Sequence, residues 1–131
     1  MQTPRVLIFE PSTFNRRLMS DLIECNDMKA VAVDGSDWVA RLEKGADRAS
    51  VVVVDLDESR RDGFEVVRRL NALPVEQRPR IVGLVDSSKA RPQAGPHVLG
   101  CEEVIERPLD TGSFARAVVR QALEARRYEL V

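Results

Sequence analysis

Residues 51–65 read V-V-V-V-D-L-D-E-S-R-R-D-G-F-E, and this segment is the most informative about the architecture. Its first four residues are β-branched and apolar, so both faces of the segment must be buried. This pattern predicts a strand of a parallel sheet that lies between two layers of helices. Ligand sites of open parallel sheets form beyond the carboxyl ends of the strands. Asp55, which ends this strand, is therefore the first candidate site residue.

Along the rest of the chain, short apolar runs alternate with stretches in which apolar residues recur at helical spacing. Five strands are predicted, at residues 6–9, 30–33, 51–54, 81–85 and 103–106. Helices are predicted between them and after the last one. Alternation of this kind indicates a single α/β domain over residues 1–131, with a parallel sheet and right-handed crossovers.

The first and last helices carry recognisable start signals. Ser12 or Thr13 is the expected N-cap of the first helix, which should bury Phe14, Leu18, Met19, Leu22 and Ile23. Asp110 is the expected N-cap of the last helix, which should bury Phe114, Val118, Ala122 and Leu123. In the segment 86–100, Pro92, Gly95 and Pro96 stand where a fourth helix belongs, so that helix should be short, displaced or partly melted.

Composition excludes several classes of protein. The chain has 20 Lys and Arg against 21 Asp and Glu, so a net charge of −1 gives no bulk support for binding nucleic acid or an anionic membrane. No apolar run approaches the roughly 20 residues of a membrane helix, and no signal peptide is recognisable. Cys25 and Cys101 lack metal-ligand spacing and are expected to be reduced packing residues of a cytoplasmic protein.

The chain resembles the receiver domain of bacterial response regulators, the CheY-like family, over nearly its whole length. Asp55 stands where the family has its phosphorylated aspartate, and Gly63 follows eight residues later. Arg107-Pro108 stands where the family has Lys-Pro, and Leu99-Gly100-Cys101 resembles its small turn before the fifth strand. The resemblance implies a doubly wound, flavodoxin-like domain with strand order 2-1-3-4-5 and helices on both faces. It also implies a cis peptide bond before Pro108.

The resemblance also implies the roles of the site residues. Asp55 would accept a phosphoryl group from a histidine kinase. Mg²⁺ would be held by Glu10, by Asp55 and by the main-chain carbonyl of Asp57. Arg107 would pair with the phosphoryl group or with a carboxylate, since a guanidinium binds either one through two hydrogen bonds.

Four departures from the family pattern weaken this chemistry. Pro11 replaces the second acidic residue after the first strand, and losing an oxygen donor weakens the binding of a hard cation such as Mg²⁺. Val85 replaces a hydroxyl residue and has no donor for a phosphoryl oxygen. Val104 replaces the aromatic switch residue, and Arg107 replaces lysine. Asp57 and Asp86 meanwhile add carboxylates near the site.

Two functions stay open at this point. The first is an atypical, stand-alone receiver domain in two-component phosphorelay signalling, which is not an enzyme and acts through contacts with a histidine kinase or an effector, a homodimer being left open. The second is a pseudo-receiver that binds proteins without being phosphorylated. A flavodoxin-like enzyme or cofactor carrier is disfavoured, because residues 10–16, E-P-S-T-F-N-R, contain no glycine and few hydroxyls for a phosphate loop, and no nucleophile elbow is found.

Overall fold

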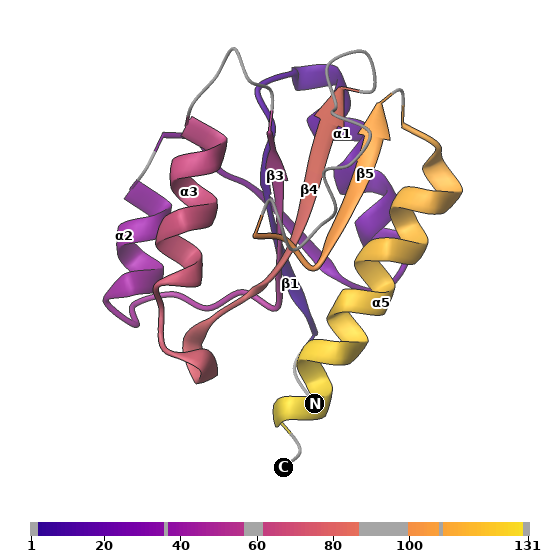
Figure 1. Ribbon diagram of the computed structural model, residues 1–131. Helices are drawn as coiled ribbons and strands as arrows, with labels where there is room; N and C mark the ends of the chain where they lie inside the picture. The colour runs from indigo at the N-terminus through magenta and orange to yellow at the C-terminus, as the bar shows by residue number, and fades with distance from the viewer. Residues whose placement is uncertain (1–2, 36, 57–61, 87–99, 108, 130–131) are drawn as a thin grey trace.

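The computed structural model describes residues 3–35, 37–56, 62–86, 100–107 and 109–129. Its centre is one sheet of five parallel strands in the order β2-β1-β3-β4-β5 (Figure 1). This confirms the predicted sheet and its strand order. The strands are β1 (Arg5–Phe9), β2 (Lys29–Ala32), β3 (Val51–Asp55), β4 (Arg80–Asp86) and β5 (Glu103–Arg107).

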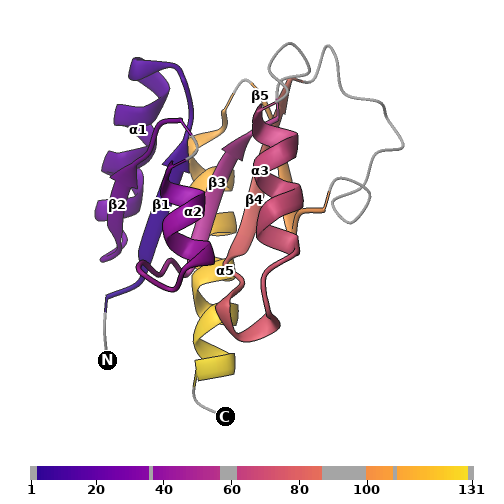
Figure 2. The same cartoon turned by 90° about the vertical axis from the view of Figure 1, so that its left-hand side faces the viewer.

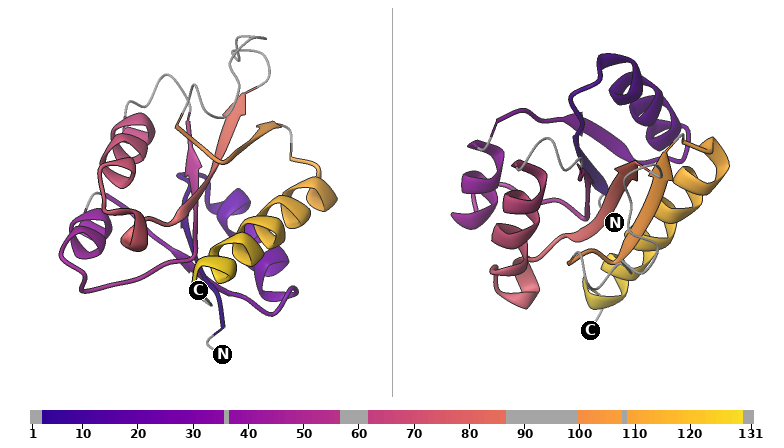
Figure 3. Two further views of the ribbon diagram at one scale, coloured as in Figure 1. Left: turned by 60° about the horizontal axis from the view of Figure 1, so that its bottom comes forward. Right: turned by 45° about the horizontal axis from the view of Figure 1, so that its top comes forward.

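Helices cover both faces of the sheet, and in Figure 2 some of them lie in front of the strands and others behind them. On one face lie α1 (Thr13–Glu24) and α5 (Thr111–Glu129); on the other lie α2 (Asp37–Glu43) and α3 (Asp62–Asn71), followed by the short 3₁₀ helix η1 (Val75–Gln77). The two turned views of Figure 3 show the same three layers. None of the helices in the described part of the chain combines the length and apolar character that a membrane crossing requires.

The sheet separates the core into two halves, and strand β3 contributes residues to both. Val51 and Val53 pack with residues of α1 and α5, while Val52 and Val54 pack with residues of α2 and α3. All four valines have no exposed surface. Alternate residues of a strand point to opposite faces of a sheet, so a run of four valines supplies both halves of the core at once. The prediction of a strand buried on both faces is therefore confirmed.

The N-caps were predicted correctly, but two helix residues were not. The Ser12 hydroxyl accepts a hydrogen bond from the Asn15 backbone N–H at 3.3 Å, and an Asp110 carboxylate oxygen accepts one from the Ser113 N–H at 3.1 Å. Phe14 and Leu123 are 76% and 56% exposed, although both were expected in the core.

The exposure of these two residues follows from helix geometry. Successive residues of an α-helix turn by about 100°. The buried stripe of α1 is centred on Met19 and Ile23, which places Phe14 on the opposite face. Similarly, Leu123 projects about 180° away from the buried Phe114. Cys25 is also exposed, contrary to prediction, because it caps the end of α1, whereas Cys101 is buried as expected.

Three predictions fall on residues that the structure does not describe. They are the irregular fourth helix within residues 86–100, the carbonyl of Asp57 as a metal ligand, and the cis bond before Pro108.

Candidate functional site

Strand register brings the first two site residues together. Phe9 of β1 lies beside Val54 of β3, so Glu10 and Asp55, the next residue of each strand's path, emerge at the same edge of the sheet. Both residues are buried, at 2% and 6% exposure. Parallel strands are only about 5 Å apart, so two carboxylates meet here in a place that water barely reaches. Such an arrangement requires a nearby cation.

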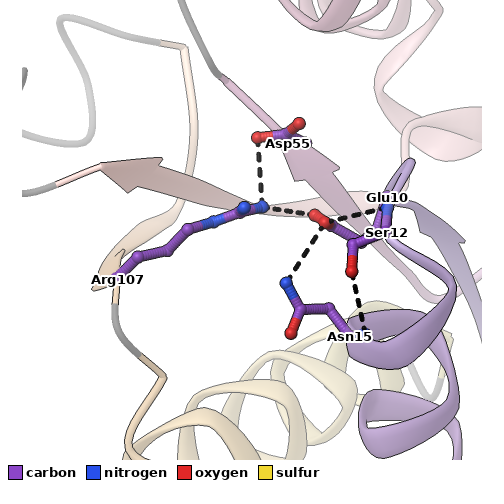
Figure 4. Close-up of polar contacts among 5 residues, drawn as sticks. All are labelled: Glu10, Ser12, Asn15, Asp55 and Arg107. Atoms are coloured by element: carbon purple, nitrogen blue, oxygen red, sulfur yellow. Dashed lines mark hydrogen bonds and ion pairs between the residues drawn. The ribbon is translucent and has the colours of Figure 1, made fainter.

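Arg107 supplies that cation from the far side of β4. It ends β5 and lies beside Asp86 of β4, so it must reach across one intervening strand toward β3. Its Nη2 group donates to an Asp55 carboxylate oxygen at 3.1 Å and also to Glu10 Oε2 (Figure 4). One guanidinium nitrogen therefore bridges both buried carboxylates. The arrangement is called the bridged triad below, and it consists of Glu10, Asp55 and Arg107.

The second oxygen of Glu10 is held by the start of α1. Glu10 Oε1 accepts hydrogen bonds from the Ser12 backbone N–H at 3.3 Å and from the Asn15 side-chain amide at 3.5 Å. The positive end of the helix dipole lies on the same side. Sequence analysis identified Ser12 only as an N-cap and missed Asn15. The sequence did contain a signal for Asn15. Ser12 and its cap partner three residues later both follow closely after Glu10, the acidic residue at the end of the first predicted strand.

Gly63 shapes the opposite wall of the site. A Cβ atom placed on Gly63 would lie 2.0 Å from the Asp55 carbonyl oxygen, far inside van der Waals contact. Helix α3 begins at Asp62 and therefore presses its first turn against the main chain of Asp55. Only glycine allows the two backbones to approach so closely. The spacing of Gly63 from Asp55 noted in the sequence has this steric cause.

A small pocket of about 120 Å³ opens beside the bridged triad. Four of the described residues that line it carry carboxylates, and none of those described carries a positive charge. The lining residues are Phe9, Glu10, Pro11, Val33, Asp34, Gly35, Asp55, Asp62 and Gly63. The volume has room for several water molecules. Glu10 and Asp55 both belong to the wall of this pocket.

Two of the four residues that depart from the receiver pattern, Val85 and Val104, pack as core residues. Val85 is buried and Val104 is half-buried, and both belong to the half of the core beneath α2 and α3. Neither offers a hydrogen-bond donor to the site. Of the residues singled out from the sequence, Glu10, Asp55 and Arg107 are thus brought into contact, and Asp57 lies outside the described residues.

The charges of the site bear on the magnesium expected from the sequence. Across the described ranges, no three Asp, Glu, His or Cys side chains gather in a geometry that could hold a metal ion. The two expected ligands that are described, Glu10 and Asp55, both point their oxygens at Arg107. In this arrangement they do not fit a divalent cation, because the guanidinium already stands between them. Magnesium binding by Glu10, Asp55 and Asp57 stays a prediction.

Comparisons with known proteins agree on the architecture. Neither a protein-family model nor a curated protein sequence matches the chain. Solved structures of receiver domains do match. The signal receiver domain of a putative LuxO repressor protein from Vibrio parahaemolyticus superposes with a TM-score of 0.76 at 17% identity, over 98% of this chain and 97% of its own. A response regulator receiver protein from Burkholderia phymatum gives 0.75 at 17% identity, over 92% and 95%.

A third match carries a metal. The receiver domain of a sensor histidine kinase from Pseudomonas aeruginosa, with a magnesium ion coordinated in its active site cleft, gives a TM-score of 0.74 at 17% identity, over 92% of this chain and 98% of its own. At these identities the comparisons establish the fold, which is the one that the stretch 51–65 and the observed strand order also indicate. The chain therefore has the CheY-like fold of response regulator receiver domains.

Proposed function

We propose that this chain is an atypical receiver module of bacterial phosphorelay signalling, with Asp55 as the phosphoacceptor and a protein as its partner. The observation that carries the proposal is the contact of Arg107 with Asp55 at 3.1 Å at the carboxyl edge of the sheet. A carboxylate paired with a guanidinium at this edge is suited to become an acyl phosphate, because the guanidinium also binds phosphoryl oxygens. A cytoplasmic location accords with this role and with two free cysteines.

The chemistry needs one nucleophile and one charge partner. A carboxylate oxygen of Asp55 attacks the phosphorus of a phosphohistidine or a small phosphodonor. A new P–O bond forms and the bond from phosphorus to the donor's leaving group breaks. A nitrogen leaving group takes a proton from solvent, whereas the acetate released from acetyl phosphate leaves as its anion. The product places more negative charge at Asp55 than the carboxylate did. Arg107, already within reach, offsets that charge, whereas Val85 contributes no hydrogen bond.

A second candidate is favoured by the same bridged triad. Because Arg107 binds Glu10 and Asp55 together, the site is held in one arrangement without any phosphoryl group. A pseudo-receiver would use this fixed state to present one constant surface to its protein partner. The two candidates differ in whether Asp55 is modified and agree in every structural feature described above.

The deciding experiment is incubation with acetyl phosphate or phosphoramidate, with and without millimolar Mg²⁺, followed by intact-mass measurement on rapidly quenched samples. A receiver gains the mass of one HPO₃ group, and Asp55→Asn abolishes the gain. Asp62→Asn is a matched control, since Asp62 also lines the pocket but is not the proposed acceptor. No adduct under any condition contradicts phosphorylation and leaves the pseudo-receiver. An adduct that persists in Asp55→Asn contradicts the assignment of the acceptor.

A further inference from the structure

We propose that Arg107 is a tethered cation that competes with divalent metal ions for Glu10 and Asp55, so that a metal ion binds tightly only when the guanidinium is removed from the bridged triad. The inference rests on the geometry of these three side chains and does not depend on whether Asp55 is phosphorylated. It concerns the resting state of the chain, which the proposed function leaves open.

The first support is the sharing of ligand atoms. Arg107 Nη2 contacts one oxygen of Glu10 and one oxygen of Asp55. These are the two described carboxylates that a divalent ion would use at this edge of the sheet. A guanidinium nitrogen and a metal ion cannot occupy the space between the same two oxygens. Binding of one must therefore displace the other.

The second support is burial. The Glu10 side chain has no exposed surface and that of Asp55 is 6% exposed, whereas Arg107 is 25% exposed. Two carboxylates so poorly hydrated require a positive charge close by. Arg107 is attached to the chain and meets this need without an ion from solution. A metal ion from solution would gain little from carboxylates that are already neutralised in part.

The third support is access for a metal ion. The pocket beside the triad has a volume of about 120 Å³, and the charged residues that line it within the described part of the chain are Glu10, Asp34, Asp55 and Asp62. Mg²⁺ keeps several of its waters and is commonly held by one or two protein carboxylates. Removing the guanidinium would leave such a pair beside the pocket without the cation that bridges its two carboxylates.

Glu10 also has contacts that do not involve Arg107, which makes removal of Arg107 informative. Its other oxygen is held by the Ser12 N–H and the Asn15 amide at the start of α1. Glu10 should therefore keep its place when Arg107 is replaced. Pro11, the next residue, adds neither a carboxylate nor an N–H donor.

The test is isothermal titration of the unphosphorylated full chain with MgCl₂ and MnCl₂. Four proteins are compared: the parent chain, Arg107→Gln, Glu10→Gln/Arg107→Gln, and Arg116→Gln. We expect Arg107→Gln to bind the ions at least about tenfold more tightly than the parent chain, which is a difference of about 1.4 kcal/mol. The double variant should lose this gain, because one of the two carboxylates is gone. Arg116→Gln removes the same charge from an exposed position on α5 and should bind as the parent chain does.

Equal metal affinity in the parent chain and Arg107→Gln would overturn the inference, as would an equal gain in Arg116→Gln, which would assign the effect to net charge. Should Arg107→Gln fail to fold, the same titration is made with Arg107→Lys, because the flexible lysine stem holds its ammonium group less firmly between the two carboxylates than the rigid, planar guanidinium is held. The metal affinity of Arg107→Lys should then exceed that of the parent chain, and an affinity no higher contradicts the proposal. None of these measurements involves phosphorylation of Asp55. A negative titration result would therefore count against this inference alone, and a negative phosphorylation result would count against the proposed function alone.

Discussion

Replacing Arg107 by glutamine should destabilise the fold strongly, since it leaves two buried carboxylates without their cation. Unit charges 3.1 Å apart, as in the Arg107–Asp55 contact, attract by about 5 kcal/mol at an effective dielectric constant of about 20. The contact with Glu10 adds to this, and the cost of dehydrating three charged groups offsets much of both. Removing one partner of a buried ion pair costs about 3–5 kcal/mol.

The low end of that range applies here. A quarter of the Arg107 side chain is exposed, so water screens part of each contact, and we expect a loss of about 3 kcal/mol in the free energy of unfolding. With a urea dependence of about 1.5 kcal/mol per molar, the unfolding midpoint falls by about 2 M. Urea denaturation at pH 7, followed by the fluorescence of the buried Trp38, measures this directly.

The same urea assay provides the control variants and the result that would refute the prediction for Arg107→Gln. Arg116→Gln should lie within about 0.5 kcal/mol of the parent chain, as exposed substitutions usually do. Glu10→Gln/Arg107→Gln should recover at least about 1 kcal/mol relative to Arg107→Gln alone, because groups in direct contact are not additive. If Arg107→Gln unfolds at the same urea concentration as the parent chain, the bridged triad does not stabilise the fold and the reasoning above is wrong.

Three further predictions concern glycine packing, thiol chemistry and a helix cap. Gly63→Ala should destabilise by more than about 2 kcal/mol, since a methyl group cannot occupy the 2.0 Å beside a β3 carbonyl oxygen; thermal unfolding with an undiminished midpoint would refute this. Burial raises the pKa of the Cys101 thiol to about 12 from 9.0, so Ellman's reagent at pH 8 should label only the exposed Cys25 in the native chain and both thiols in urea. The stability linked to the protonated Cys101 is fully present at neutral pH and should be lost as the pH rises from 9.0 toward about 12. Hydrogen bonds from the Ser113 hydroxyl and backbone lower the pKa of Asp110 below 3.8, so Asp110→Ala should be less stable than the parent chain at pH 7, with a difference that shrinks as the pH falls below 3.8; a constant difference would contradict an ionised cap.

Matched variants isolate each of these effects. Gly112→Ala adds the same methyl group in α5, where it meets only the mobile end of Arg116 at 3.1 Å, and it should change the unfolding midpoint little. Cys25→Ser should abolish the fast thiol reaction, and Cys101→Ser should leave it intact. If instead Cys101 reacts as fast as Cys25 in the native chain, the burial described for its thiol is incorrect.

Local sequence patterns were enough to predict the order of the strands and helices. They also explain why the central strand, β3, is buried on both faces. Four consecutive valines at 51–54 can be satisfied only by burial on both faces, and the structure buries all four. Ser12 and Asp110 were recognised as caps because their oxygens bond to backbone donors only a few residues away. Asp55 and Arg107 were singled out because strand ends mark the site edge of a parallel sheet and because their positions resemble a known pattern.

The partners of those residues depended on contacts between distant parts of the chain. Residues 10 and 107 are nearly a hundred positions apart in the sequence. The residues around each of them do not predict that one guanidinium nitrogen contacts both Glu10 and Asp55. The burial of Glu10 arises from the register of β1 against β3 together with the docking of α1. Pairing energies between charges depend on distance and hydration, and both quantities exist only once the chain has folded.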